Sequence, residues 1–267
     1  MKQYLIADSG GTKTDWCLID RNDRKEFFTS ESYHPVHWDK DFFNRNRMYW
    51  EKIKGKEDIT VCFFGAGCFH TENCLEISRF FETIGFRSVE IYSDLHSAAI
   101  SSYGENNGRV AILGTGSVLF DWNNGEIVHR IGGKGHLYGD EGSGYYFGKL
   151  IIERFRNNLL NEYQIKCIKK LNIDQIDLND KFKVANISKL LSNEKKGFSI
   201  VHRQNIEVFI VSHDLLLSKD KLSIVGSYGF HHQEIIRSVF ERNGLTVSLF
   251  IEKPIFCLVE YRAVFID

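Results

Sequence analysis

Short apolar runs along this chain each end in a loop rich in glycine, serine, threonine or aspartate. The run YLIA at residues 4–7 enters the loop DSGGTKTDW at 8–16, and the segments WCLID and EFFTS follow at 16–20 and 26–30. This pattern predicts a β-meander whose first turn is the glycine loop. The runs DITVCFFGAG at 58–67 and SVEIYSD at 88–94 predict two more strands. Each is followed by a predicted helix, at 73–85 and just after Asp94.

A similar pattern returns after residue 107. RVAILGTGS at 109–117, SVLFDWNNG at 117–125 and EIVHRIGGKG at 126–135 again predict strands separated by turns of small residues. A helix is expected at 141–157, and the last unit runs from KLSIVGSYGFHH at 221–232 through a helix at 233–244 to a strand at 245–251. The chain is therefore expected to fold as two similar units of an α/β architecture, with sites in the loops at the carboxyl ends of strands.

Composition excludes several classes of protein. The 267 residues are 43% hydrophobic and 26% charged, which is typical of a soluble globular protein long enough for two domains. Lys and Arg number 34 against 35 for Asp and Glu, so the formal net charge is only -1. The protein as a whole therefore has no electrostatic attraction for nucleic acid or an anionic membrane. No apolar stretch approaches the roughly 20 residues of a membrane span, and the N-terminal run fits a first strand better than a signal peptide.

The 6 cysteines form no C-x-x-C pair, so reduced thiols and a cytoplasmic location are expected. Cys62, Cys68 and Cys74 are six residues apart, and we interpret them as half-buried strand and helix residues rather than as a metal site.

Four loops carry the candidate chemistry: DSGGTKTDW (8–16), SDLHSAA (93–99), LGTGS (113–117) and GDEGSG (139–144). Because glycine has no Cβ, backbone N–H groups in such loops can approach a polyphosphate closely. Asp8 and Asp15 bring negative charge to the same region, which calls for a divalent cation such as Mg²⁺ between them and a nucleotide. The Walker spacing is absent around GYYFGKL at 144–150, and no G-x-G-x-x-G follows a strand.

These loops, together with VGSYGFHH at 225–232, resemble in their order those of the BadF/BadG/BcrA/BcrD ATPase family, and within it the N-acetylglucosamine kinases of the actin, sugar kinase and Hsp70 superfamily. The resemblance covers nearly the whole chain. It implies two ribonuclease H-like domains flanking a central cleft, with residues 1–105 on the sugar side and 106–267 on the nucleotide side. It also implies an ATP-dependent kinase that uses Mg²⁺ and phosphorylates a hydroxyl of N-acetylglucosamine or a related amino sugar.

Site residues follow from the same resemblance. Asp94 is the candidate catalytic base, and Asp8 orients the metal through water. The nucleotide-binding candidates are Gly10, Gly11, Thr12, Lys13, Gly114, Thr115, Gly116, Gly226 and Ser227. The sugar-binding candidates are His34, Ser117, Lys134, Gly135 and Asp140.

The residues themselves support the role of Asp94. It follows an apolar strand and begins a helix, where the dipole favours the ionised carboxylate, and phosphoryl transfer to an alcohol needs a group that accepts the hydroxyl proton. A purely structural role as helix N-cap is the alternative, and the other loops make catalysis the preferred interpretation.

Other positions have two interpretations. Asp140 and Glu141 cap the helix that starts near residue 142, or Asp140 binds a sugar hydroxyl, as the resemblance implies, and the two roles are compatible. Lys13 is either a solvated loop residue or a phosphate contact. We expect Asp15 to bond loop backbone, and His231 and His232 to lie on the surface.

The chain departs from the family pattern in three regions. His34 stands where relatives usually have asparagine, and Lys134 stands where kinases of N-acetylglucosamine commonly have tryptophan. A lysine there can meet a carboxylate or phosphate, so we expect a glucosamine derivative with an acidic group, such as a muramic acid, as a secondary substrate. The segment between 166 and 205 is shorter than in relatives, and Ser9 replaces a common glycine.

Two other functions stay open. Some family members are ATPases that activate a radical dehydratase through an iron–sulfur cluster held by cysteines of two subunits, which the cysteines here do not obviously match. A catalytically silent sugar and nucleotide sensor is the third alternative. The expected partners are a small sugar and ATP, without nucleic acid or membrane, and a homodimer is left open.

Overall fold

Two compact units make up the protein in the computed structural model, which describes residues 2–39, 41–194, 196–217 and 221–266. Unit 1 comprises Met1–Gly104 together with Lys253–Asp267, and unit 2 comprises Glu105–Glu252. The C-terminal segment Lys253–Asp267 therefore belongs to unit 1, whereas the prediction from sequence assigned all of 106–267 to the second domain. Its helix α10 (Pro254–Glu260) buries apolar residues and packs against α3 (Asp94–Tyr103) of unit 1. The apolar residues of α10 indicate that the helix is buried on one side, but they do not indicate which domain it packs against.

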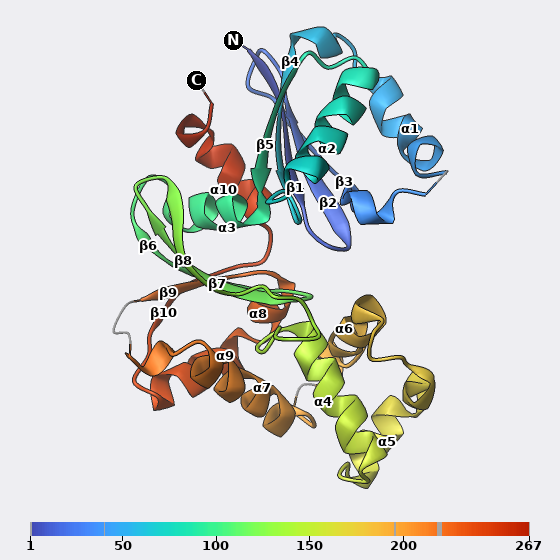
Figure 1. Cartoon of the computed structure of the whole chain (residues 1–267), viewed down its shortest axis with the longest axis vertical. Helices are drawn as coiled ribbons and strands as arrows, with labels where there is room; N and C mark the ends of the chain where they lie inside the picture. The colour runs from blue at the N-terminus through green and yellow to red at the C-terminus, as the bar shows by residue number, and fades with distance from the viewer. Residues whose placement is uncertain (1, 40, 195, 218–220, 267) are drawn as a thin grey trace. The chain divides into compact units, whose positions relative to one another are not determined.

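Unit 1 is a five-stranded mixed sheet with helices (Figure 1). The antiparallel meander consists of β1 (Gln3–Ser9), β2 (Lys13–Ile19) and β3 (Lys25–Glu31), and β4 (Ile59–Gly65) and β5 (Ser88–Ser93) continue the sheet parallel to β1. The strand order is β3-β2-β1-β4-β5. Helices α1 (Phe42–Lys52) and α2 (Thr71–Thr83) complete the unit with α3 and α10.

Unit 2 repeats this topology. Its meander is β6 (Gly108–Leu113), β7 (Ser117–Asn123) and β8 (Glu126–Gly132), followed by β9 (Leu222–Val225) and β10 (Val247–Ile251) in the order β10-β9-β6-β7-β8. Its helices are α4 (Gly144–Arg156), α5 (Glu162–Ile168), α6 (Lys181–Leu190), α7 (Ser199–Ser212), α8 (Ser227–His231) and α9 (Gln233–Arg242). The same strand order in both units confirms the prediction of two similar α/β folding units.

The register of the parallel strands gathers the loops of each unit at one edge. Ser9 pairs with Gly65 and Gly65 pairs with Ser93, so β1, β4 and β5 end side by side. In unit 2, Ile112 of β6 pairs with Val225 of β9 near the ends of both strands. The candidate loops of each unit therefore start from a common edge.

An aromatic core supports the meander of unit 1. The ring of Trp16 makes edge-on contacts with Tyr33 and Trp50, each at 5.1 Å between centroids. Its indole N–H donates to Ser30 Oγ at 2.8 Å, and the indole N–H of Trp50 donates to the Tyr33 hydroxyl at 2.9 Å. Because the buried polar atoms of these rings are paired, the base of the first hairpin is held in a single packing arrangement.

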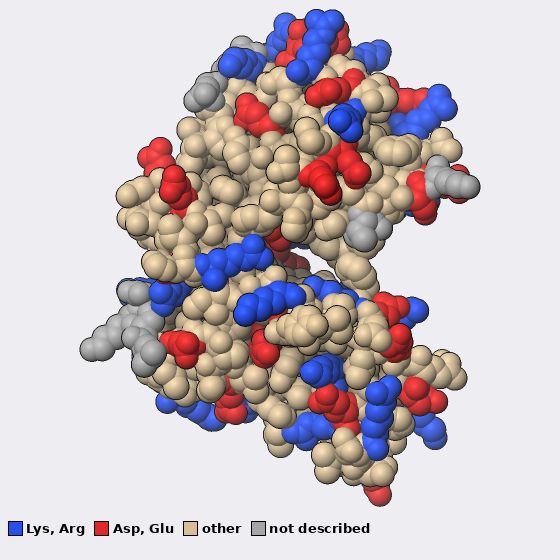
Figure 2. Space-filling view, in the orientation of Figure 1, with Lys and Arg blue, Asp and Glu red and all other residues tan. Residues whose placement is uncertain are grey.

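The surface mixes charges of both signs. Figure 2 shows Lys and Arg side chains interspersed with Asp and Glu on the face that it draws. No helix in the described part of the chain has the length and apolar character needed to cross a membrane.

Candidate functional site

Asp8 lies at the end of β1 and is surrounded by other acidic groups. Its Oδ1 accepts a hydrogen bond from Ser97 Oγ at 2.6 Å. Burial, together with the charges of Asp15 and Asp94, raises the pKa of Asp8 to about 7, against the opposing effects of Ser97 and Lys13. This edge of unit 1 therefore carries an excess of negative charge.

The loop between β1 and β2 is a tight turn held from several sides. The Gly10 N–H donates to the Lys13 carbonyl at 3.0 Å, and Ser32 Oγ donates to the Gly10 carbonyl at 2.7 Å. His37 Nε2 lies 3.0 Å from the Gly11 carbonyl oxygen. Thr12 is exposed at the tip. The turn thus presents its glycines and Thr12 on a fixed backbone.

Lys13 and Asp15 form an ion pair beside this turn. The two charged groups are 2.6 Å apart, and the other oxygen of Asp15 accepts from Thr29 Oγ1 at 2.6 Å. Asp15 therefore binds side chains, and the expectation that it bonds loop backbone was wrong. Lys13 is exposed, and its ammonium group is paired with the carboxylate of Asp15.

Asp94 is the first residue of α3, directly after β5. The N-cap position belongs to Ser93, so the alternative role of Asp94 as the N-cap was wrong. Asp94 is half-buried. Its charge raises the pKa of Asp8 and, after burial and Cys74, that of Cys68. Asp94 therefore shares one edge of the sheet with Asp8.

The loop between β4 and α2 adds residues that the sequence analysis missed. Its Ala66 N–H donates to the Ser9 carbonyl at 2.8 Å. Gly67 has a φ of +81°, and a Cβ there would lie 2.4 Å from His34 Nε2. Burial lowers the pKa of His34, as do the neighbouring His37 and His70. The glycines of FGAG at the end of an apolar strand are the signal that could have identified this loop.

In unit 2 the loop LGTGS joins the start of α4. The Gly114 N–H donates to the Gly116 carbonyl at 3.0 Å, and the Gly144 N–H donates to the Gly114 carbonyl at 2.9 Å. The Tyr145 N–H donates to the Thr115 carbonyl at 3.2 Å. These bonds fix the turn between β6 and β7 against the first turn of α4.

Gly226 brings the loop after β9 onto the same turn. It has a φ of +111°, and a Cβ there would lie 2.8 Å from the Leu113 carbonyl oxygen and 3.2 Å from the Gly114 nitrogen. Only glycine tolerates both this conformation and this approach. The predicted nucleotide residues of unit 2, Gly114, Thr115, Gly116, Gly226 and Ser227, therefore belong to one cluster.

Asp140 lies buried beside this cluster. Its Oδ1 accepts the Ser117 N–H at 2.9 Å, and its Oδ2 lies 3.0 Å from Lys181 Nζ. Ser143 is the N-cap of α4 and accepts the Tyr146 N–H, so the capping interpretation of Asp140 and Glu141 was wrong. Oδ1 therefore has a hydrogen bond within the protein, whereas Oδ2 has only the ion pair with Lys181 and no hydrogen-bond partner among the described residues. Lys181 is not among the residues that the sequence predicts for the site.

Lys134 and Gly135 lie on the loop after β8, where the Gly133 N–H donates to the Ser117 carbonyl at 3.1 Å. Gly135 has a φ of +83° and its carbonyl accepts the Tyr138 N–H at 3.2 Å. Lys134 is exposed, and Tyr138 on the same loop is 80% exposed. Within the described residues, no hydrogen bond or ion pair joins Lys134 to Asp140.

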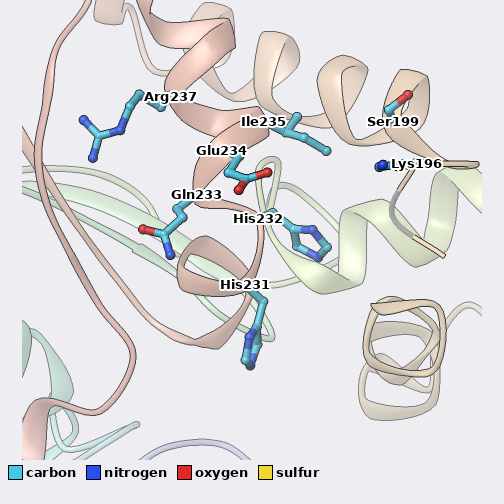
Figure 3. Close-up of a pocket in the computed structure, with 8 residues that line it drawn as sticks. All are labelled: Lys196, Ser199, His231, His232, Gln233, Glu234, Ile235 and Arg237. Carbon is cyan, nitrogen blue, oxygen red and sulfur yellow. The ribbon is translucent and has the colours of Figure 1, made fainter. Parts of the chain in front are cut away.

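A pocket of about 510 Å³ opens beside α8 and α9 (Figure 3). It is lined by Lys196, Ser199, His231, His232, Gln233, Glu234, Ile235 and Arg237. His231 is exposed and lies 3.4 Å from the Glu252 carboxylate. His232 is buried, and its ring centroid lies 3.9 Å from that of His202. The expectation of a surface position was therefore wrong for His232.

Asn205 connects α7 with the start of α4 and with α8. It is fully buried, and its Oδ1 accepts the Gly142 N–H at 2.7 Å. Its Nδ2 donates to the Ser143 carbonyl and to the Tyr228 hydroxyl, both at 2.9 Å. Asn205 thus joins α7, the start of α4 and α8 in one hydrogen-bonded network.

No protein-family model matches the chain. It is 32% identical over 168 residues to the N-acetylmuramic acid/N-acetylglucosamine kinase of Clostridium acetobutylicum, which covers 55% of this chain and 51% of that protein. It is 30% identical over 170 residues to the N-acetyl-D-glucosamine kinase of Dictyostelium discoideum, covering 56% of this chain and 52% of that protein. The chain spans about half the length of these curated relatives.

Solved structures share the fold over nearly the whole chain. A candidate N-acetylglucosamine kinase from Porphyromonas gingivalis has a TM-score of 0.79 at 24% identity, covering 97% of this chain and 98% of that one. A ROK family glucokinase from Streptomyces griseus, solved with glucose and AMPPNP, has a TM-score of 0.57 at 14% identity, covering 98% of both chains. The chain therefore has the two-domain α/β fold of the actin-like ATPases and sugar kinases, and it is related in sequence to curated kinases of N-acetylated amino sugars.

Proposed function

We propose that this protein is an ATP-dependent kinase that phosphorylates a hydroxyl of N-acetylglucosamine or a related amino sugar. The observation that carries the proposal is the edge of unit 1, where Asp94 stands beside Asp8 next to a rigid glycine turn. The kinship with curated kinases of amino sugars gives the substrate class.

Asp94 acts as the general base in this proposal. Phosphoryl transfer to an alcohol depends on positioning and charge stabilisation, and a carboxylate accepts the hydroxyl proton as the new bond forms. Its place in the first turn of α3 favours the charged form. The residue is half-buried, so part of its surface reaches solvent.

Asp8 and its neighbours fit a magnesium ion. A partly buried carboxylate with a pKa raised to about 7 by burial and by the Asp15 and Asp94 charges lacks a full counter-charge from the protein. Mg²⁺ prefers one or two carboxylates and keeps several waters, and when bound it neutralises charge on the triphosphate. Asp8 would hold it through water, while Ser97 fixes the orientation of the carboxylate.

Unit 2 takes the nucleotide in this proposal. The backbone of LGTGS receives the phosphates, because its glycines allow close approach. The pocket in Figure 3 begins where α8 ends, shortly after Gly226 and Ser227. We assign the base to this pocket, whose size and mixture of polar and apolar walls suit a flat heterocycle.

The loop after β8 favours an amino sugar with an acidic substituent as a second substrate. Lys134 provides an exposed positive charge there, and Tyr138 provides an exposed aromatic ring four residues later. Sugar rings stack on aromatic faces, and a lactyl carboxylate can pair with an ammonium group. N-acetylmuramic acid carries both features.

A coupled assay of ADP release across amino sugars tests the proposal. Turnover should appear only with sugar, Mg²⁺ and ATP together, with N-acetylglucosamine or N-acetylmuramic acid among the active substrates, and mass spectrometry should find the phosphorylated sugar. Nucleotide and sugar binding without turnover would favour a sensor. Sugar-independent ATPase activity with iron bound after anaerobic purification would favour a dehydratase activator.

A further inference from the structure

Lys181 is a cation placed against the LGTGS turn by a part of the chain far from it in sequence. It is the first residue of α6, and its Nζ lies 3.0 Å from Asp140 Oδ2. The Lys181 side chain is 28% exposed, whereas that of Asp140 is 3% exposed. The carboxylate is therefore enclosed, while the ammonium group reaches solvent.

The pair is in close contact with Gly116. A Cβ built on Gly116 would lie 2.6 Å from Asp140 Oδ1 and 2.8 Å from Lys181 Nζ. The ammonium group thus lies at the backbone of the turn that the proposed function assigns to the phosphates. Glycine is needed here because a side chain would displace the pair.

Helix packing fixes the position of Lys181. A Cβ on Gly148 of α4 would lie 2.0 Å from the Val184 carbonyl oxygen of α6, so the two helix backbones touch. One turn earlier, Gly144 packs against Ala185 and donates its N–H to the Gly114 carbonyl. Helix α6 is therefore locked to α4, and α4 is locked to the LGTGS turn.

The hydrogen-bonding capacity of Lys181 is not exhausted. An ammonium group has three donors, and in the part of the chain that the structure describes, Asp140 is its sole ion-pair partner. Asp140 is itself held by the Ser117 N–H. The carboxylate can therefore orient the ammonium group and leave donors for an anion.

We propose that Lys181 binds a terminal phosphate of the nucleotide on the LGTGS turn, and that the ion pair with Asp140 positions its ammonium group there. The assignment rests on the proposed function for the nucleotide itself. Lys181 would be a phosphate-binding residue from α6, which lies outside the glycine-rich loops that the sequence singles out.

Calorimetric titration of Lys181→Gln with ATP, ADP, AMP and adenosine tests the assignment. Because a hydrogen bond to a charged group is worth more than a neutral one, affinity for ATP should fall by about tenfold or more, while affinity for adenosine stays unchanged. Lys183→Gln is the matched control, since Lys183 lies on the same helix, is exposed and pairs with Asp180. It should bind all four ligands like the unaltered protein.

The variant Asp140→Asn tests whether a loss of ATP affinity in Lys181→Gln reflects misfolding instead of a lost phosphate contact. Its amide oxygen still accepts the Ser117 N–H, so folding is preserved, while Lys181 loses its anchor and ATP affinity falls less than in Lys181→Gln. Melting curves of each variant confirm folding. Normal ATP binding by Lys181→Gln, or equal losses for ATP and adenosine, would overturn this assignment alone. Failure of the unaltered protein to bind any adenine nucleotide would overturn the proposed function and this assignment together.

Discussion

Replacing Asp8 by asparagine should stabilise the metal-free protein at alkaline pH and at the same time abolish its kinase activity. The carboxylate is partly buried and stands near Asp15 and Asp94, so its charge is unfavourable in the folded protein without a cation. Asparagine has nearly the same shape and keeps an oxygen that can accept the hydrogen bond from Ser97. Only the charge is removed.

The magnitude follows from the pKa. Folding raises the pKa of Asp8 from 3.8 to about 7, and each tenfold change in an acid constant is worth about 1.4 kcal/mol, so the cost of the charge is at most about 4 kcal/mol. Because the pKa is raised on folding, the stability linked to this group is complete below pH 3.8 and is lost as the pH rises through about 7.

Urea denaturation in EDTA, from pH 5 to pH 8, measures the difference between the two proteins. The free energy of unfolding of Asp8→Asn should exceed that of the unaltered protein by an amount that grows with pH. This difference should increase by up to about 1.4 kcal/mol per pH unit between pH 5 and pH 7 and then level off. Asp58→Asn, which alters an exposed ion pair with Arg21, should show no such growth. An advantage that does not depend on pH, or greater stability of the unaltered protein at pH 8, would refute the reasoning.

Three further substitutions test other parts of the account. Gly226→Ala should lower ATP affinity about tenfold and cost about 1–3 kcal/mol of stability, because the φ of +111° at Gly226 and its contact with a backbone carbonyl exclude a Cβ. An unchanged ATP affinity and an unchanged melting temperature would contradict this prediction. Asn205→Ala should lower the free energy of unfolding, measured in denaturant, by about 2–5 kcal/mol, because it leaves the buried Gly142 N–H and the Ser143 carbonyl unpaired. An unchanged denaturation midpoint would contradict this prediction. Ser199→Trp should fill the pocket in Figure 3 and weaken ATP and adenosine binding alike, and normal adenosine affinity would place the base elsewhere.

The strand pattern was predictable because each unit repeats the same local signals. Apolar runs that end in glycine loops marked the meanders, and the parallel strands followed from the alternation with helices. The position of Asp94 at the first turn of a helix was also visible, since an apolar strand ends immediately before it. These features depend on residues close together in sequence.

The features that sequence reasoning missed depend on distant residues. Lys181 and Asp140 are joined across 41 positions by the packing of α4 on α6, which no local pattern encodes. His232 was expected on the surface because it lies at a helix start with no carboxylate or cysteine at ligand spacing, yet it is buried, with its ring against that of His202. The start of α4 was placed too early because Asp140 and Glu141 are common capping residues, while Ser143 is the actual cap.

Turnover of Asp94→Asn with the best amino sugar tests the central claim most directly. The account predicts that sugar-dependent ADP release falls by about a hundredfold or more, as expected for loss of a general base, while titrations show unchanged affinities for ATP and sugar. Asp58→Asn provides the matched control and should keep full turnover. Undiminished sugar phosphorylation by Asp94→Asn would contradict the account.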